Sequence, residues 1–246
     1  MSTYCFSDIH GNYNLWKQVK AYLKPEDKVY FLGDAFDKGD CGVQILLEML
    51  ADSRFTLLRG NHEQFLLDNF KKLSTPYFEE ESFWSLFNGG YDTIKYLKKR
   101  MSESERAQLY NKIKEMPLYM YATNNKNQLF ILSHSGFNPW LTEQDEKIFY
   151  GSTIEERYMW NRDHIINRKW VYDKDTYMVH GHTPTDVALE DYFGIPMTED
   201  HKNETLFYCE NHKIDIDLGC FYSHRTCLFD IDTFESIYFE ETKNEE

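Results

Sequence analysis

Side chains that bind divalent metal ions recur at short polar corners along the chain. Each corner directly follows a short apolar run of the kind that forms a β-strand. Carboxylate, amide and imidazole groups together accept manganese, iron or zinc, and two ions that share a carboxylate can activate water against a phosphate ester. The pattern therefore favours metal-assisted hydrolysis of a phosphate ester, with six candidate ligands: Asp8, His10, Asp34, Asn61, His134 and His182.

Any one of these corners alone is weak evidence. A single Asp or His after a strand is more often a turn or cap residue than a ligand. Asp37 could be an ordinary turn former, and Gly60-Asn61 a β-turn dipeptide. Several such corners in succession, each after a strand and flanked by glycines, make a shared metal site the better interpretation.

The elements that must position these ligands alternate between strand and helix in the first part of the chain. Such alternation indicates βαβ units and a largely parallel sheet, in which ligands bind beyond the carboxyl ends of the strands. The first three polar corners fall at those ends. The predicted strands are residues 4–6, 29–32 and 55–58, and the predicted helices are residues 15–23, 43–50 and about 65–70.

The rest of the chain changes character twice. Residues 76–117 are predicted to form a helical insertion beside the site, with a capping box from Ser102 to Glu105. The later residues predict a hairpin and further short strands, which would form a second, mixed sheet packed on the first. We therefore expect one domain over residues 1–240, followed by an acidic tail at 241–246. The predicted later strands are 118–122, 129–132, 177–179, 206–208, 213–216 and 226–230.

Composition narrows the classes of function. The 246 residues are 41% apolar and 17% aromatic, enough for a large core, and the net charge of −14 argues against binding a nucleic acid polymer. The five cysteines show no Cys-x-x-Cys spacing, which favours a reducing compartment. No apolar run is long enough to span a membrane, and no signal peptide is recognisable. These features predict a cytoplasmic protein without a membrane partner.

Five motifs, in the same order, resemble those of the calcineurin-like metallophosphoesterases, and more narrowly the phosphoprotein phosphatase branch with its bacterial and phage-type serine/threonine protein phosphatases. The resemblance covers residues 7–219. Trp160-Asn161-Arg162 and Ile216-Asp217-Leu218-Gly219 resemble the small bacterial and phage-type members. The five motifs are Asp8-Ile9-His10-Gly11, Gly33-Asp34-Ala35-Phe36-Asp37-Lys38-Gly39, Gly60-Asn61-His62-Glu63, Ser133-His134-Ser135-Gly136 and Gly181-His182-Thr183.

This resemblance implies a fold and a metal centre. The fold would be a four-layer αββα sandwich of two mixed β-sheets, with the site where both sheets end. Two divalent ions, manganese first and iron or zinc as alternatives, would share Asp34 and a hydroxide that attacks phosphorus. The first ion would be held by Asp8, His10 and Asp34, and the second by Asp34, Asn61, His134 and His182.

The resemblance also implies roles for charged residues around the metals. His62 would protonate the leaving oxygen rather than bind metal, with Asp37 orienting its imidazole. Arg59 and Arg162 would bind the phosphoryl oxygens. Two positions depart from the family pattern: Ser7 replaces a glycine, and Lys38 replaces an arginine. Lysine keeps the charge but loses the two-pronged guanidinium, so we expect Lys38 to give weaker phosphate binding or a shifted substrate preference.

Three functions remain open on the sequence alone. The leading interpretation is a serine/threonine phosphoprotein phosphatase. The alternative is a symmetrical dinucleoside tetraphosphate hydrolase, which shares the scaffold and the motif order, and the third is a non-catalytic binding module. Glu63 and Trp160-Asn161-Arg162 favour the first. The partner would be a phosphoprotein or a small phosphate ester, and the oligomeric state is not predicted. His180, two residues before His182, is expected to be a packed histidine more than a support for the metal site.

Overall fold

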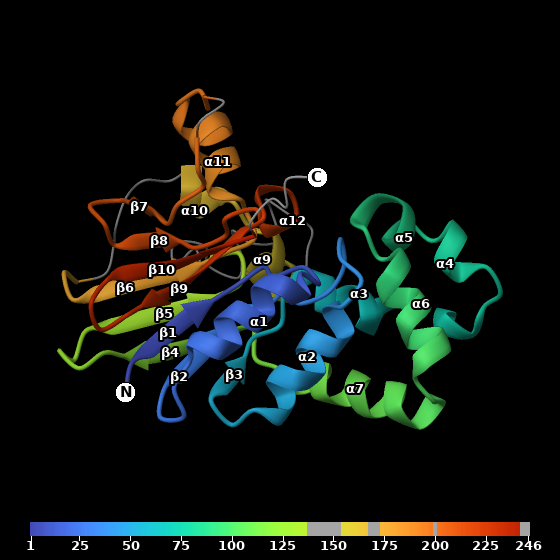
Figure 1. The fold of residues 1–246 in the computed structure, drawn as a ribbon. Coiled ribbons are helices and arrows are strands. Elements are labelled where there is room, and N and C mark those ends of the chain that lie inside the picture. The colour runs from blue at the N-terminus through green and yellow to red at the C-terminus, as the bar shows by residue number, and fades with distance from the viewer. Residues whose placement is uncertain (137–153, 167–172, 199–200, 242–246) are drawn as a thin grey trace.

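Two five-stranded β-sheets lie face to face in the computed structural model, with helices on both outer sides (Figure 1). The structure describes residues 1–136, 154–166, 173–198 and 201–241. This arrangement confirms the predicted αββα sandwich. Residues 242–246 of the predicted acidic tail lie outside the described part of the chain.

The first sheet contains the predicted parallel strands β1 (Thr3–Phe6), β2 (Lys28–Phe31) and β3 (Phe55–Leu57). Its order is β10-β9-β1-β2-β3, because β9 (Arg225–Asp230) and β10 (Glu235–Glu240) extend it as antiparallel strands. The prediction that residues 226–230 belong to the second sheet is therefore wrong. The first sheet is mixed, as the family resemblance implies, and not largely parallel, as the alternation of strands and helices predicts. β10 was not predicted.

The second sheet has the order β4-β5-β6-β8-β7 and is mixed, as predicted. β4 (Tyr119–Thr123) and β5 (Leu129–Ser133) form the expected antiparallel hairpin. The other strands are β6 (Thr176–His180), β7 (Leu206–Tyr208) and β8 (Lys213–Asp215). β5, β6 and β8 run parallel, so their carboxyl ends meet at one edge.

The main core lies between the two sheets and beneath the helices. α1 (Tyr13–Tyr22), α2 (Gly42–Ala51) and α3 (Asn61–Asn69) follow the three parallel strands of the first sheet. On the side of the second sheet lie α10 (Asp163–Ile166), α11 (Thr185–Val187) and η2 (Ala188–Tyr192). α9 (Ile154–Trp160) and α12 (Cys220–Ser223) lie near the ends of the strands. Buried side chains that fill the space between the sheets include Cys5, Leu32, Phe130, Leu132, Val179, Ile214 and Phe229.

A helical lobe projects from one end of the sandwich (Figure 1). We use this name for α4 (Phe78–Glu81), α5 (Phe83–Asn88), α6 (Tyr91–Arg100) and α7 (Glu103–Glu115), which follow the 3-10 helix η1 (Phe70–Ser74). The predicted capping box is present, since the Glu105 carboxylate accepts from the Ser102 backbone N–H at 2.7 Å. In the described ranges, no helix is both long and apolar enough to cross a bilayer.

Candidate dimetal site

The predicted ligands come together where the two sheets end. Asp8 and His10 follow β1, Asp34 follows β2, and Asn61 opens α3 directly after β3. His134 follows β5 and His182 follows β6, so the second sheet contributes both. Five of the six side chains are buried and His182 is partly exposed. Segments far apart in sequence therefore deliver polar side chains to one place.

Asp34 lies at the centre of the cluster. Its carboxylate forms one group of potential ligand atoms with His10 and His62, and a second group with His134 and His182; within each group all atoms lie within 4.8 Å of one another. Oδ2 of Asp34 is 3.9 Å from Nε2 of His10 and 3.4 Å from Nε2 of His134. A carboxylate shared by both groups is what a bridging ligand requires.

The Asn61 side chain completes the second group. Its Oδ1 lies 2.8 Å from Nε2 of His134 and 3.0 Å from Nδ1 of His182. An amide oxygen and two imidazole nitrogens therefore face one small volume next to Asp34. Oxygen and nitrogen donors of this kind bind first-row divalent metals.

Backbone carbonyls fix the orientation of two of the imidazoles. Nδ1 of His10 lies 2.9 Å from the Phe36 carbonyl, and Nδ1 of His134 lies 2.9 Å from the Leu32 carbonyl. When Nδ1 carries the proton and donates it to the carbonyl, Nε2 is left with a lone pair that points into the cluster. Such support is typical of metal-binding histidines.

Two buried atoms in the cluster have no hydrogen-bond partner among the described residues. They are Oδ1 of Asp8 and Nε2 of His182. A buried polar atom that is unpaired is costly and rare, and a bound cation would satisfy Oδ1 of Asp8. The nitrogen of His182 that faces Asn61 is Nδ1, so the unpaired Nε2 lies on the other side of the ring. Oδ2 of Asp8, in contrast, accepts from the His182 backbone N–H at 3.1 Å and from the Ser7 hydroxyl. The residues present thus fit divalent cations.

The charges of the cluster are strongly coupled. Burial raises the pKa of a carboxyl group, but the imidazoles of His134 and His62 outweigh it and hold the pKa of Asp34 well below its usual range. Burial lowers the pKa of His134, yet the Asp34 carboxylate raises it to about 9. The Asp34 carboxylate and the His134 imidazole, 3.4 Å apart, therefore favour each other's charged forms. A metal ion would replace the imidazole proton.

His62 and Asp37 form a buried pair beside the ligands. Nδ1 of His62 is 2.7 Å from Oδ2 of Asp37, and its Nε2 is 3.7 Å from Oδ2 of Asp34. Burial lowers the pKa of His62, but the Asp34 charge and the hydrogen bond to Asp37 raise it above its usual value. A protonated imidazole can act as an acid. The potential ligand atom of His62 also lies within 4.8 Å of those of Asp34 and His10, so a proton carried by Nε2 would lie directly beside the cluster.

Lys38 and Arg162, two of the predicted phosphate-binding cations, interact with candidate ligands. Nζ of Lys38 is 3.3 Å from Nε2 of His10 and 4.2 Å from the centre of the Phe221 ring. Arg162 is partly exposed and is close enough to His182 that its charge, after burial and His134, lowers the pKa of that imidazole. Arg59 is buried, and its backbone N–H donates to the Pro117 carbonyl at 3.1 Å.

Glu63 has a structural role that the sequence did not predict. Its buried carboxylate accepts hydrogen bonds from the backbone N–H groups of Asp34 and Ala35, both at 2.8 Å, and of Gly60 at 3.0 Å. It therefore ties the Asp34 corner to the Asn61 corner. Its place directly after Asn61 and His62 was the only available signal. Two glycines leave room for the ligand carboxylates. A Cβ at Gly60 would overlap the carboxylate of Asp34, and a Cβ at Gly181 would overlap that of Asp8.

His180 is a packed histidine, the interpretation that the sequence favoured. Its Nε2 lies 2.7 Å from the Tyr208 hydroxyl and 3.3 Å from Nε2 of His164. Nδ1 of His180 lies 3.1 Å from the Gly181 carbonyl. Both histidines are buried. His164 is therefore also a packed histidine.

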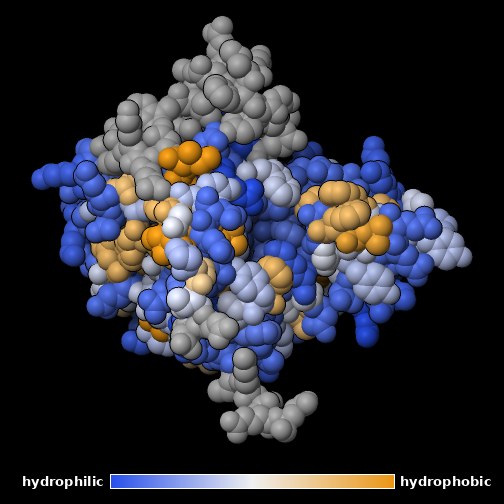
Figure 2. All heavy atoms as spheres, turned by 90° about the horizontal axis from the view of Figure 1, so that it is seen from above, coloured by the Kyte–Doolittle hydropathy of each residue, from blue (hydrophilic) through white to orange (hydrophobic). Residues whose placement is uncertain are grey.

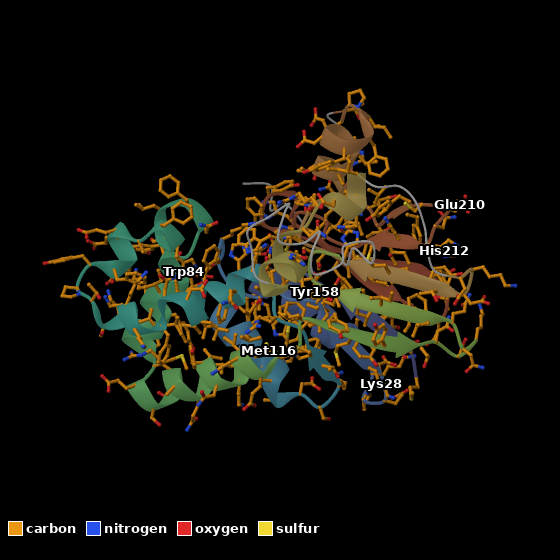
Figure 3. The ribbon with its side chains drawn as sticks, turned by 180° about the vertical axis from the view of Figure 1, so that it is seen from behind. Lys28, Trp84, Met116, Tyr158, Glu210 and His212 are labelled. Carbon is orange, nitrogen blue, oxygen red and sulfur yellow. The ribbon has the colours of Figure 1, made fainter. Side chains whose placement is uncertain are left out.

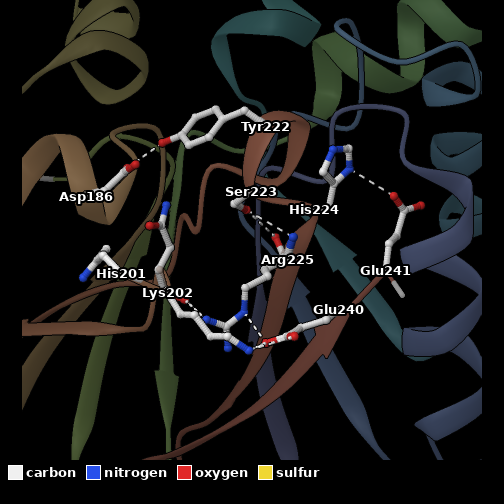
Figure 4. Close-up of a pocket in the computed structure, with 10 residues that line it drawn as sticks. Asp186, His201, Lys202, Tyr222, Ser223, His224, Arg225, Glu240 and Glu241 are labelled. Atoms are coloured by element: carbon white, nitrogen blue, oxygen red, sulfur yellow. Dashed lines mark hydrogen bonds and ion pairs between the residues drawn. The ribbon is translucent and has the colours of Figure 1, made fainter. Parts of the chain in front are cut away.

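A separate cavity of about 540 Å³ opens beside α12 and contains none of the predicted ligands (Figure 4). Several of its charged side chains form ion pairs with one another. Arg225 Nε is 2.8 Å from a Glu240 carboxylate oxygen, and His224 Nδ1 is 3.0 Å from Glu241. The metal-site geometry is therefore independent of this cavity.

Comparison with known proteins agrees with the geometry. The chain is 25% identical over 180 residues to serine/threonine-protein phosphatase 1 of Salmonella typhimurium, covering 72% of this chain and 76% of that protein. Two solved structures share the fold. A protein serine/threonine phosphatase from Saccharomyces cerevisiae has a TM-score of 0.59 at 14% identity, covering 100% of this chain and 82% of that one. A putative diadenosine tetraphosphatase has a TM-score of 0.58 at 15% identity, covering 96% and 92%.

The family model described as calcineurin-like phosphoesterase matches residues 1–225, which include every candidate ligand. Family membership carries a dimetal-dependent chemistry that acts on phosphate esters, and the shared Asp34 carboxylate is where such chemistry would be centred. Because the fold, the convergence of the candidate ligands and this family match all agree, the chain belongs to the calcineurin-like phosphoesterase family.

Proposed function

We propose that this protein is a serine/threonine phosphoprotein phosphatase that uses two divalent metal ions, with manganese as the first candidate. The observation that carries the proposal is the Asp34 carboxylate, shared by two ligand groups and flanked by the His62–Asp37 pair. When bound, the metal ions would supply Lewis acidity and an activated water for attack on phosphorus.

The remaining chemistry belongs to the chain itself. A serine or threonine alkoxide is a poor leaving group and needs a proton as the bond to phosphorus breaks. We assign His62 Nε2 as the donor of that proton, because Nδ1 is held at 2.7 Å by Asp37. Arg162 and Lys38 would attract and orient the phosphoryl group from either side of the ligands. Asp8, His10, Asn61, His134 and His182 would hold the metals with Asp34.

We further propose that the substrate is a phosphoprotein. This proposal is supported by the similarity to the Salmonella phosphatase. Exposed apolar side chains also lie on α5, the helix that carries Trp84: Phe83, Leu86 and Phe87 are 67%, 60% and 72% exposed. Figure 2 shows an apolar patch on the helical lobe, across a hydrophilic hollow from the body of the molecule. A polypeptide substrate could contact such a patch while its phosphate occupies the site.

A direct comparison of substrates tests this function. Purified protein loaded with manganese should hydrolyse p-nitrophenyl phosphate and should turn over phosphoserine peptides faster than diadenosine tetraphosphate. Asp34→Asn should abolish all three activities, while the exposed control Asp68→Asn should keep them. If the dinucleotide is turned over far faster than the peptides, the protein is a nucleotide hydrolase instead. A complete lack of activity with every metal would leave only the binding-module interpretation.

The role of His62 has its own test. Loss of a general acid costs roughly 10²–10⁴-fold in rate when the leaving group is strongly basic. His62→Asn should therefore lose phosphoserine turnover far more than p-nitrophenyl phosphate turnover, and should still bind two metals. Equal losses with both substrates would contradict the acid role.

A further inference from the structure

The helical lobe is hydrogen-bonded directly to the segment that carries Asp37. The Asp37 backbone N–H donates to the Thr93 hydroxyl at 3.1 Å, and the Lys38 backbone N–H donates to the Gly89 carbonyl at 3.0 Å. The third contact is made by a side chain, since Nε1 of Trp84 donates to Oδ2 of Asp37 at 2.6 Å. The lobe thus contacts both the backbone and the carboxylate of this residue.

Trp84 is firmly held in this position. It is 1% exposed and lies where the helical lobe meets the rest of the molecule (Figure 3). Its ring stacks on Phe65 of α3 at 6.2 Å between ring centres. The indole also lies against Gly90, where a Cβ would overlap the ring. Packing on both sides leaves the N–H little freedom to point elsewhere.

One carboxylate oxygen of Asp37 contacts both the His62 imidazole and the Trp84 indole. Oδ2 of Asp37 lies 2.7 Å from Nδ1 of His62 and 2.6 Å from Nε1 of Trp84. Oδ1 of Asp37 has no partner among the described residues, and the side chain is fully buried. With only His62 as a donor, the carboxylate could rotate about its Cβ–Cγ bond. The indole N–H fixes which oxygen faces the imidazole and stabilises the charge of a fully buried carboxylate.

We propose that Trp84 is a positioning residue for leaving-group protonation, acting through Asp37 on His62. This inference rests on the proposed acid role of His62. It assigns to the helical lobe a part in the chemistry, because the lobe places the indole that orients the carboxylate, which in turn orients the imidazole. The effect is confined to the proton-transfer step, since Trp84 is not among the candidate metal ligands.

Replacement of the indole by a ring without a donor tests the inference. In the manganese-loaded enzyme, Trp84→Phe should lower kcat for a phosphoserine peptide by about tenfold, a fraction of the roughly 10²–10⁴-fold that an acid supplies. KM for the peptide and kcat for p-nitrophenyl phosphate should change by less than about twofold, because p-nitrophenolate leaves without needing a proton. A purely structural loss would lower both activities together.

Trp16 provides a matched control. It is also a buried tryptophan whose Nε1 donates to a carboxylate, that of Glu48, at 2.9 Å, but it packs against Phe6 and Phe55 under α1. Trp16→Phe removes the same atoms and the same kind of hydrogen bond. It should cost similar stability in a urea titration and leave the ratio of peptide to p-nitrophenyl phosphate turnover unchanged.

The outcomes separate this inference from the function on which it rests. If His62→Asn loses peptide turnover selectively and Trp84→Phe does not, Trp84 has no positioning role. If His62→Asn loses both activities equally, the acid role itself is wrong and the inference falls with it. Should Trp84→Phe fail to fold, Trp84→Met fills the space with a flexible side chain that has no donor, and the same selective loss is expected.

Discussion

Several residues of the site occupy backbone conformations that side chains other than glycine rarely adopt. Asp8, His10, Asp34 and His182 have φ angles of 50°, 45°, 64° and 72°, and Asp37 has 67°. Such residues cost about 1–3 kcal/mol each and persist only where their surroundings fix them. Glu63 supplies part of that support through its three backbone hydrogen bonds at the Asp34 and Gly60 corners.

Glu63→Gln should therefore weaken the whole site without touching a ligand. The amide keeps one acceptor oxygen but places an NH₂ donor against a backbone N–H. We expect a loss of about 3 kcal/mol in the free energy of unfolding, because a buried backbone N–H that now donates to the carboxylate would face an NH₂ donor and lose its acceptor. Manganese binding should weaken as well, because Asp34 and Asn61 lose their common support. Urea titration and calorimetric metal titration measure the two effects.

The exposed residue Glu80 provides the control, since Glu80→Gln changes the same functional group at the surface. It should leave both the unfolding midpoint and the metal affinity unchanged. Normal metal affinity in a destabilised Glu63→Gln variant would show that the hydrogen bonds of Glu63 support folding but not metal binding.

Lys38 can be tested by restoring arginine. The Lys38 ammonium group lies over the Phe221 ring and 3.3 Å from His10 Nε2, so a guanidinium at this position would start beside the metals with two N–H groups for phosphate. Lys38→Arg should lower KM for p-nitrophenyl phosphate by about threefold to tenfold, the difference of roughly 1 kcal/mol expected for a second hydrogen bond. An unchanged KM with every phosphate ester would contradict the role in phosphate binding.

Which features of the site can be predicted from the sequence depends on how far apart the contributing residues are along the chain. The convergence of the candidate ligands could be predicted because each follows its strand, and the strand pattern is local. The contact between Trp84 and Asp37 could not be predicted, because the two residues are 47 positions apart in the sequence. A single tryptophan in a helix is normally interpreted as a core residue. Glu63 belongs to a motif, but its residue type does not show whether a glutamate is buried and bonded to the backbone or exposed to solvent.

At the scale of elements, local patterns predicted which segments are strands better than which strands pair. β9 is buried along its whole length because it lies between β1 and β10 in the first sheet. That antiparallel pairing joins the two ends of the chain, and no local pattern indicates it. β10 carries glutamates at both ends and forms the edge of the sheet. Edge strands are often charged, which hides them from a search for apolar runs.

Helices α1 and α2 are joined through one carboxylate. Glu48 of α2 accepts from Trp16 Nε1 at 2.9 Å and from Lys20 Nζ at 2.7 Å, and also from the Tyr13 hydroxyl at 3.0 Å. Partial burial raises the pKa of this carboxyl, but the hydrogen bonds from Lys20 and Trp16 outweigh it and lower the pKa from 4.5 to about 2. The folded state therefore holds the charged form more strongly than the unfolded chain does.

The stabilisation by Glu48 should depend on pH in a defined direction. Because the folded pKa is depressed, the contribution is complete above about pH 4.5 and is lost as the pH falls toward 2. Glu48→Gln should lower the free energy of unfolding by about 1–2 kcal/mol at pH 7, and the gap to the wild type should narrow below pH 4.5. Urea titrations at several pH values measure this gap.

Glu26→Gln, at an exposed position, is the control and should leave the free energy of unfolding close to that of the wild type. A gap for Glu48→Gln that widens as the pH falls would mean that the carboxylate is destabilising, and the proposed link between the helices would be wrong.

At the scale of the whole molecule, the candidate metal centre lies between the two sheets. Asp8, His10 and Asp34 follow strands of the first sheet, whereas His134 and His182 follow strands of the second. Direct contacts between the two sides include the hydrogen bond from the His182 backbone N–H to Asp8 at 3.1 Å and the 3.4 Å approach of His134 to Asp34. Ions held by both sets would therefore connect the sheets at this edge.

Metal binding should then stabilise the fold as a whole. A ligand at 100 times its Kd adds about 2.7 kcal/mol when it binds only the folded state, and a chain of this size gains about 2–4 °C in Tm per kcal/mol. Manganese at that ratio should raise the Tm of protein treated with a chelator by roughly 5–10 °C. Asp34→Asn, which removes the bridging carboxylate, should lose most of this gain, whereas the exposed Asp68→Asn should retain it. Differential scanning fluorimetry with and without manganese measures each shift. An Asp34→Asn variant that gains as much as the wild type would show that the stabilising ions bind elsewhere and that the two sheets are held together without them.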